Sequence, residues 1–299
     1  MKIMTGNARI LATLAGILWL STGFAGEDVD RTIAAASSGS VKITNTRGEV
    51  DIFGWDKDEI RVKGELDALT EEFIFKVEGN QARIEVRLPR HNVNWGDGSD
   101  LEIYVPENSR VDFKGVSTDA TFKNILGGLR VRSVSGDISV DQIRKRVHIK
   151  SVSGDVDVSD SSGEVNISTV SGEIQLEMTS LRIMLDTVSG DIEAEFAEIS
   201  MLRVNAISGG IEVEGRLVDH GKIDISGVSS DLVLKLVEPV NAQLSVETGP
   251  GGDIDNSLTD DEPIERFPSR MALEVTLGSG TGEIHLRTVS GDIRIDDAS

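Results

Sequence analysis

A short motif recurs at a fixed interval in the middle of the chain, and this repeat constrains the fold more than any other feature. The motif reads Val-Ser-Gly-Asp or a close variant. Its acidic residue is Asp119, Asp137, Asp155, Glu173 and Asp191, each 18 residues after the one before. A fixed period of this kind indicates structural units that stack on one another and share one continuous core.

Five positions around each acidic residue are apolar in all five copies. In the copy at Asp155 they are Val147, Ile149, Val152, Val156 and Val158. Apolar residues that alternate with polar ones are typical of strands with one buried face. We therefore predict two short strands in each copy, with these apolar columns inside. One of the columns consists of Val116, Val134, Val152, Val170 and Val188.

The two halves of each copy resemble each other, so the 18-residue unit is a doubled nonapeptide, V-x-V-x-x-V-S-G-D. We predict an all-β fold, a parallel right-handed β-helix or β-solenoid with 18-residue coils of two nonapeptide strands. Stacked coils would place like residues above one another at intervals of about 4.8 Å. The alternative is an antiparallel β-sandwich. Only 4% of residues are aromatic, so either core would consist of Val, Ile and Leu, which suit pleated walls.

The Ser-Gly-Asp segment has a structural explanation as the corner between two strands. Glycine adopts a positive φ without steric cost, and Ser and Asp side chains can bond to backbone groups that a turn leaves unpaired. Gly154 would let the chain turn, and Asp155 would cap the corner.

The ends of the chain differ from the repeat. Residues 1–25 combine Lys2 and Arg9 with an apolar run and are predicted to be a signal peptide. Residues 26–40 form a polar lead, and residues 41–299 form a single β-solenoid domain. Within it, 41–110 is an irregular N-terminal part or cap, 111–215 holds the regular coils, and 216–299 holds the C-terminal coils with an acidic loop at 247–270.

Charge and cysteine content exclude several classes of function. The chain has 30 Lys and Arg against 51 Asp and Glu, a net charge of −21, which argues against nucleic acid or anionic lipid as a general partner. It has no Cys, so thiol catalysis and thiolate metal sites are excluded. We expect an exported protein, periplasmic, surface-bound or secreted, without a membrane span once the signal is removed.

The outward positions of the two strands differ in charge. Those of the first strand are mainly basic, and those of the second are mainly acidic. The first set is Lys114, Arg130, Arg132, His148, Lys150 and Arg203, against Asp112 and Asp186. The second set is Asp141, Asp157, Glu177, Glu193, Glu195, Glu212 and Glu214, against Lys123. The candidate binding-face residues are Arg130, Arg132, His148 and Lys150, with Trp55 and Trp95 in or near the irregular segments.

The sequence gives weaker evidence for a metal site or an active site than for the fold. Stacked corner acids could attract calcium, which prefers carboxylate and carbonyl oxygens. The candidates are Asp137, Asp155, Glu173 and Asp191, with Asp253 and Asp255 in the acidic loop. The turn supplies one acid and one glycine, fewer ligands than the richer turns of calcium-binding β-rolls. No catalytic motif is present, and the pair Asp155 and Asp157 belongs to the repeat. We predict no catalytic residues and no cofactor other than calcium.

The chain resembles the bacterial "putative adhesin" family, a β-helical domain of unknown function in exported and envelope proteins. The resemblance rests on the segments NTRGEVDIFGWDKDEIRVKG and LEIYVPENSRVDFKGVSTDATF and on the SVSGDI series, and it covers nearly the whole mature chain. It implies surface adhesion and offers no catalytic residues to carry over. By analogy, it also allows a role in envelope stress.

The sequence therefore predicts a non-catalytic structural or binding module of the bacterial envelope, similar to an adhesin. Its partner would be an envelope protein or a surface glycan. The alternatives are a sensor or regulator of envelope stress that binds a protein or peptide, and an enzyme that acts on polysaccharide.

Overall fold

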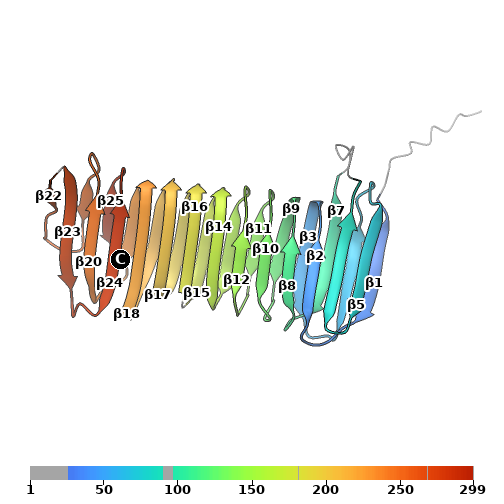
Figure 1. Cartoon of the computed structure of the whole chain (residues 1–299). Coiled ribbons are helices and arrows are strands. Elements are labelled where there is room, and N and C mark those ends of the chain that lie inside the picture. Colours follow the sequence, from blue (N-terminus) through green and yellow to red (C-terminus); the bar gives the residue numbers. More distant parts are fainter. Residues whose placement is uncertain (1–25, 90–96, 181, 268, 299) are drawn as a thin grey trace, which may run out of the picture.

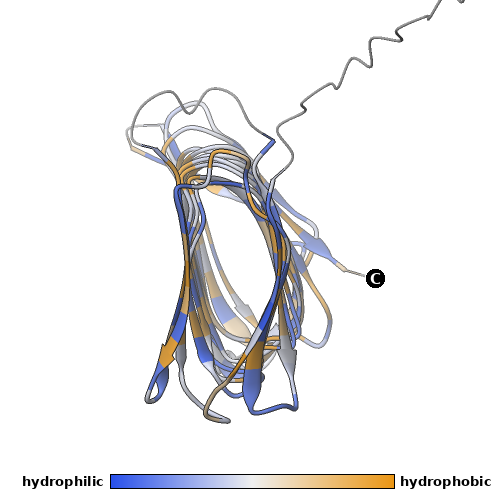
Figure 2. Ribbon diagram, turned by 90° about the vertical axis from the view of Figure 1, so that its right-hand side faces the viewer, coloured by the Kyte–Doolittle hydropathy of each residue, from blue (hydrophilic) through white to orange (hydrophobic). Residues whose placement is uncertain are grey.

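The chain folds into two facing β-sheets that extend along one long axis (Figure 1). The computed structural model describes residues 26–89, 97–180, 182–267 and 269–298, and within these ranges it has 25 strands. Each regular coil contributes one strand to each sheet, and the end-on view of Figure 2 shows the sheets facing each other. The predicted parallel β-solenoid is confirmed. No helix within the described ranges has the length and apolar character to span a membrane.

We call the sheet that contains the first strand of each regular coil the first-strand sheet. From the N-terminal end of the axis it contains β5 (Glu72–Glu78), β6 (Gln81–Arg87), β2 (Ser40–Thr44), β8 (Arg110–Lys114), β10 (Leu129–Arg132), β12 (Val147–Lys150), β14 (Glu164–Ser171), β16 (Arg182–Ser189), the second halves of β17 (Ile192–Ser208) and β18 (Ile211–Ser229), β24 (Gly282–Thr288), β20 (Ala242–Thr248), β23 (Arg270–Leu277) and β22 (Ile264–Arg266).

The opposite sheet is the second-strand sheet. In the same direction it contains β1 (Asp28–Ala34), β4 (Glu59–Glu65), β7 (Ser99–Pro106), β3 (Arg47–Trp55), β9 (Ser117–Lys123), β11 (Ile138–Asp141), β13 (Val156–Ser161), β15 (Ile174–Ser180), the first halves of β17 and β18, β19 (Leu232–Leu236), β25 (Ile293–Asp297) and β21 (Ile254–Asn256).

The register of the regular coils follows the 18-residue repeat. Val147 pairs with Leu129 on one side and with Val165 on the other. Later coils are longer, because Ile183 pairs with Leu202 and Leu202 pairs with Ile223. The extra residues lie where β17 and β18 bend from one sheet into the other, so the core register continues past the bends.

Both ends of the solenoid are interleaved, so chain order and spatial order differ there. At the N-terminal end, the coil of β2 and β3 lies between the coil of β6 and β7 and that of β8 and β9. At the C-terminal end, the coil of β24 and β25 lies between that of β18 and β19 and that of β20 and β21. Antiparallel strands end both sheets at the N-terminal end, with β1 and β5, and the first-strand sheet at the C-terminal end, with β22 and β23. The second-strand sheet ends there in the parallel strand β21.

Two segments that the sequence marks as irregular also form strands. The polar lead at 26–40 contains β1, which pairs antiparallel with β4. The acidic loop at 247–270 contains β21 and β22. The predicted signal peptide lies outside the described residues.

The core is a thin aliphatic layer between the sheets. Four of the five predicted columns are buried in all five copies, as Val147, Ile149, Val156 and Val158 show in one coil. Phe113 and Phe122 widen the core where the regular coils begin, with ring centroids 5.4 Å apart in an edge-to-face contact.

The fifth column was predicted wrongly. Val116, Val134, Val152, Val170 and Val188 are 43–50% exposed, not inside. The strand alternation continues into the corner, so the residue before each valine faces inward. Ser151 takes that inner position and its hydroxyl donates to the Ser153 carbonyl (3.0 Å), which leaves Val152 outside. Ile207, Val228 and Val289 continue this exposed line.

Each corner lies directly against the corner of the coil before it. Gly154 has a φ of 106°, and a Cβ built there would lie 2.3 Å from the Gly136 carbonyl oxygen. The corner glycine is therefore required for two reasons: its left-handed conformation and its lack of a side chain.

We expect Gly154→Ala to lower the free energy of unfolding by at least about 3 kcal/mol, because the new methyl group would displace a backbone carbonyl and also strain φ. Gly251 is the matched control, since its φ is 91° and a Cβ there meets nothing within 4 Å. Gly251→Ala should cost only about 1 kcal/mol. Urea denaturation followed by circular dichroism measures both, and equal losses would show that packing between corners is unimportant.

Candidate binding surface

Each corner aspartate bonds to the next coil, whereas Glu173 accepts the side-chain amide of Gln175 (2.9 Å). The Asp137 carboxylate accepts the backbone N–H of Asp155 (2.9 Å), and the Asp155 carboxylate accepts that of Glu173 (2.8 Å). The same bond joins Asp119 to Asp137, Asp191 to Gly210, Asp231 to Asp292 and Asp292 to Asp253. The structure thus gives Asp155 the capping role, as a link between neighbouring coils.

We use "corner acids" for the residues that follow each exposed aliphatic residue by three positions. They are Asp119, Asp137, Asp155, Glu173, Asp191, Asp231 and Asp292. Within the described ranges, none of them belongs to an ion pair. Each uses a carboxylate oxygen as an acceptor, which leaves its negative charge uncompensated at the surface.

The calcium candidates stay a prediction. Asp137, Asp155 and Asp191 each accept a backbone N–H of the next coil, and Glu173 accepts the Gln175 side-chain amide. Asp255 lies 3.4 Å from Arg294. In the part of the chain that the structure describes, no three His, Cys, Asp or Glu side chains form a group that could hold a metal ion.

Four candidate residues of the binding face come together on the first-strand sheet. Arg130 pairs in register with His148, and Arg132 with Lys150, on the adjacent strands β10 and β12. Arg132 also lies 3.3 Å from Asp112, whereas Arg130 and Lys150 have no ion pair among the described residues. Burial lowers the pKa of His148, and the nearby cations Lys150 and Arg130 lower it further. We call these four residues the basic patch.

The aromatic candidates are not part of this patch. Trp55 lies on the second-strand sheet near the N-terminal end, where its indole N–H donates to the Glu59 carbonyl (2.8 Å). Its ring lies 5.1 Å from that of Tyr104, and the Lys57 amine lies 4.5 Å from its centroid. These contacts pack Trp55 against β7 and the start of β4 in the N-terminal part of the solenoid. Trp95 lies outside the described residues.

The acidic positions of the second strand also lie together, on the outer face of the second-strand sheet. Asp157 is in register with Gln175, which is in register with Glu193 and then Glu212. Lys235 lies 2.5 Å from Glu212 and neutralises part of this surface. The two faces of the solenoid therefore carry opposite charge over the regular coils.

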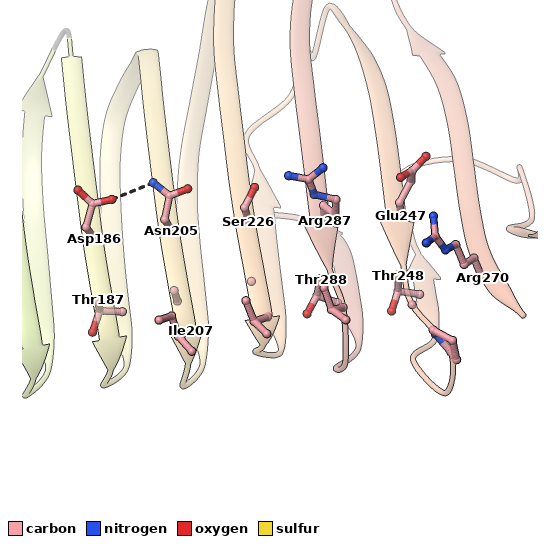
Figure 3. Close-up of a pocket in the computed structure, with 16 residues that line it drawn as sticks. Asp186, Thr187, Asn205, Ile207, Ser226, Glu247, Thr248, Arg270, Arg287 and Thr288 are labelled. Carbon is pink, nitrogen blue, oxygen red and sulfur yellow. Dashed lines mark hydrogen bonds between the residues drawn. The ribbon is translucent and has the colours of Figure 1, made fainter. Parts of the chain in front are cut away.

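A groove that sequence reasoning did not predict lies at the C-terminal end of the first-strand sheet (Figure 3), with a volume of about 660 Å³. Its floor forms where the inner corner position loses its hydroxyl in two neighbouring strands. That position is Thr187, Ala206, Gly227, Thr288 and Thr248 in successive strands. The absence of a hydroxyl at Ala206 and Gly227 is the sequence signal that could have located the groove.

The two walls of this corner groove differ in polarity. On one side stand polar side chains, among which the Asn205 amide donates to the Asp186 carboxylate (2.8 Å). Arg287, Glu247 and Arg270 close the far end, as Figure 3 shows. The other side is formed by the last exposed aliphatic corner residues, Ile207, Val228 and Val289, together with Pro250. The groove thus joins a polar sheet face to an apolar corner.

Buried hydroxyls near the groove floor lack partners. Among the described residues, the Thr187 and Ser230 hydroxyls are buried without a hydrogen bond. In the coil before, the hydroxyl that corresponds to that of Thr187 bonds within its corner, since Thr169 donates to the Ser171 carbonyl (2.9 Å). The Thr288 and Thr248 hydroxyls on the same floor do bond, to the Ser230 and Gly291 carbonyls (both 3.0 Å).

The architecture defines a β-solenoid of parallel coils with interleaved, capped ends. The chain belongs to the Toastrack DUF4097 family, whose model matches residues 27–296. The predicted resemblance to an adhesin-like family of unknown function is confirmed.

Two solved structures are similar in fold. One is a "putative cell adhesion protein" from Clostridium sporogenes, 12% identical, with 91% of this chain and 100% of that chain covered and a TM-score of 0.23. The other is a "putative adhesin" from Bacteroides fragilis, 14% identical, with 90% and 97% covered and a TM-score of 0.47. Among curated proteins, no sequence matches this chain.

The bonds between corner acids and the next coil can be tested by substitution. Asp155→Ala removes the acceptor for the Glu173 N–H and should lower the free energy of unfolding by about 1 kcal/mol. Asp155→Asn keeps an acceptor oxygen and should change it by less than about 0.5 kcal/mol. Chemical denaturation measures both variants, and an Asn variant as unstable as the Ala variant would show that the charge matters rather than the bond.

Proposed function

We propose that this protein is a non-catalytic, adhesin-like binding module of the bacterial envelope that holds an anionic surface glycan on its basic patch. The observation that carries this proposal is a set of neighbouring cations in a strongly acidic chain. Arg130 and Lys150 lack ion pairs among the described residues, and they stand on adjacent strands. The predicted signal peptide supports export.

The local charge of the patch favours an anion. Like charges on neighbouring strands repel one another, and a bound anion relieves that repulsion. The lowered pKa of His148 is a sign of this crowding, because the nearby cations contribute to it after burial. The net charge of −21 opposes approach of a polyanion, so the contact should be local, moderate in affinity and sensitive to salt.

A polymer fits the patch better than a small ion. The side chains lie on a flat sheet face and repeat at the strand spacing of about 4.8 Å, which suits a chain with regularly spaced charges. A small anion would need a concave site that excludes water.

A second candidate function is binding of a protein or peptide, as a sensor or regulator would require. The corner groove and the exposed aliphatic corners favour it, since exposed apolar surface that is continuous across several coils is typical of interaction sites. The two functions use different surfaces of the solenoid and do not exclude each other.

Removing the cations of the patch should weaken binding of an anionic polysaccharide. We expect Arg130→Ser, Arg132→Ser and Lys150→Ser together to weaken binding of dextran sulfate, a model polyanion, by at least about tenfold, because charge-assisted contacts dominate such an interface. Isothermal titration calorimetry at low and high salt measures the change.

The control for this variant removes three cations elsewhere. Arg203, Lys222 and Arg266 each belong to an ion pair, with Asp224, Glu283 and Glu274. Their triple Ser variant has the same net charge as the patch variant. If both variants lose affinity equally, total charge rather than the patch determines binding, and the proposal fails.

Binding should also depend on pH through His148. Burial and the neighbouring cations hold the pKa of His148 below its ordinary value, so it is mostly neutral at pH 7.5 and gains charge as the pH falls. Arg130, Arg132, Lys150 and Arg146 lower this pKa, and a bound polyanion offsets them and favours the protonated form. Affinity for dextran sulfate, whose sulfates stay ionised, should therefore rise between pH 7.5 and 5.5.

His148→Gln should remove most of this rise while leaving the affinity at pH 7.5 within about twofold. The two pH profiles are compared by the same calorimetry. An unchanged rise in the Gln variant would assign the pH dependence to other groups.

A further inference from the structure

The exposed aliphatic residues of the corners form one continuous line along the solenoid. We call it the valine ridge. Its members, one from each of eight neighbouring coils, are Val116, Val134, Val152, Val170, Val188, Ile207, Val228 and Val289. Among the described residues they are eight of the eleven large hydrophobic side chains that are exposed.

Nothing in the corner geometry requires an aliphatic side chain at these positions. The valine backbone supplies the bond between coils, as the Ser153 N–H donates to the Val134 carbonyl (2.9 Å) and the Ser171 N–H to the Val152 carbonyl (2.9 Å). The side chains themselves are 43–56% exposed, so a hydroxyl-bearing side chain of the same shape would serve the fold equally well. An apolar line of this length indicates a surface that a partner covers.

The charges beside the ridge restrict what that partner can be. Seven of the eight ridge residues are followed three positions later by a corner acid. A second copy would bring two such rows of carboxylates together, and an anionic membrane would also be repelled. A partner with cations beside its own apolar stripe would be attracted.

The spacing of the ridge restricts the partner's backbone. Ridge side chains repeat at the strand spacing of about 4.8 Å. In an amphipathic helix, successive residues of the apolar stripe are on average about 3.5 positions apart in sequence and so about 5.3 Å apart along the axis. Over the length of the ridge the stripe therefore falls out of step by less than one ridge spacing. In an extended strand, side chains on the same side lie about 6.7 Å apart, so by the third coil they no longer match the positions of the ridge side chains.

We propose that the valine ridge is the docking site for an amphipathic helix of a protein partner, with an apolar stripe on the ridge and Lys or Arg beside the corner acids. The ridge spans about 34 Å, which corresponds to a helix of about 23 residues. Its C-terminal end opens into the corner groove, so the end of the helix lies against Ile207, Val228 and Val289. This site does not include the basic patch, and the inference is independent of the proposed glycan binding.

The probe for this site is a synthetic, fluorescein-labelled peptide of about three heptads with Leu at the a and d positions and Lys along one flank. A second peptide carries Glu in place of Lys. Fluorescence anisotropy with the mature chain should show binding of the Lys peptide at least about tenfold tighter than binding of the Glu peptide.

Two sets of variants separate the apolar and the charged contributions. Val152→Thr, Val170→Thr and Val188→Thr together keep the β-branched shape and should weaken Lys-peptide binding by at least about tenfold. The control, Met201→Thr with Ile264→Thr, removes exposed apolar side chains away from the ridge and should have no effect. Asp137→Asn with Asp155→Asn keeps the acceptor oxygens and should weaken binding in low salt by about fivefold.

Three results would overturn the proposal. One is equal binding of the Lys and Glu peptides, and another is unchanged affinity in the valine variant. The third is a dimer of the wild-type chain in sedimentation velocity that the valine variant dissociates, because the occupant would then be a second copy. In all cases, dextran sulfate binding by the valine variant reports separately on the basic patch.

Discussion

The contact between one corner and the corner before it determines the spacing of every other group in this molecule. The glycine backbone lies against the preceding carbonyl, with no room for a Cβ at Gly154 or Gly172. The next residue's N–H is held by the preceding coil's carboxylate, as in the bond from Asp155 to Asp137. Backbone groups and one short side chain thus fix the rise of each coil. The outward side chains are attached to this stacked backbone, so like residues of successive coils form columns with the spacing of neighbouring strands.

The same constraint explains why function must be sought in departures from the repeat. A side chain that occurs in every coil is explained by the coil itself, as the corner acids show. The basic patch is such a departure, because the outward position that holds Arg130 and His148 on β10 and β12 holds the neutral Asn166 on the next strand, β14. The corner groove likewise appears where Ala206 and Gly227 replace the usual hydroxyl residue. The valine ridge is the exception, since it repeats in every regular coil although the corner does not need its side chain.

Much of the fold could be predicted from the sequence, because the repeat encodes local geometry. The coil length, the two strands, the corner glycine and the charge of each outer face follow from the 18-residue columns. The position of Val152 could not be read from residue type alone. Its neighbour Ser151 is small and polar but buried, because its hydroxyl bonds within the turn. The groove was missed for a related reason, since Ala206 and Gly227 look unremarkable until their strands are aligned side by side.

The arrangement of the ends could not be predicted at all, since it depends on pairings between distant segments. Ile223 pairs with Ile284, 61 residues later, in place of the next coil in the chain. The coil of β24 and β25 therefore enters between two coils that precede it in sequence. Antiparallel strands end both sheets at the N-terminal end and the first-strand sheet at the C-terminal end, and their hydrogen-bond pattern does not match that of a further parallel coil. Within the described residues, a further parallel coil from another molecule would find a matching strand edge only at β21, one of the four sheet ends.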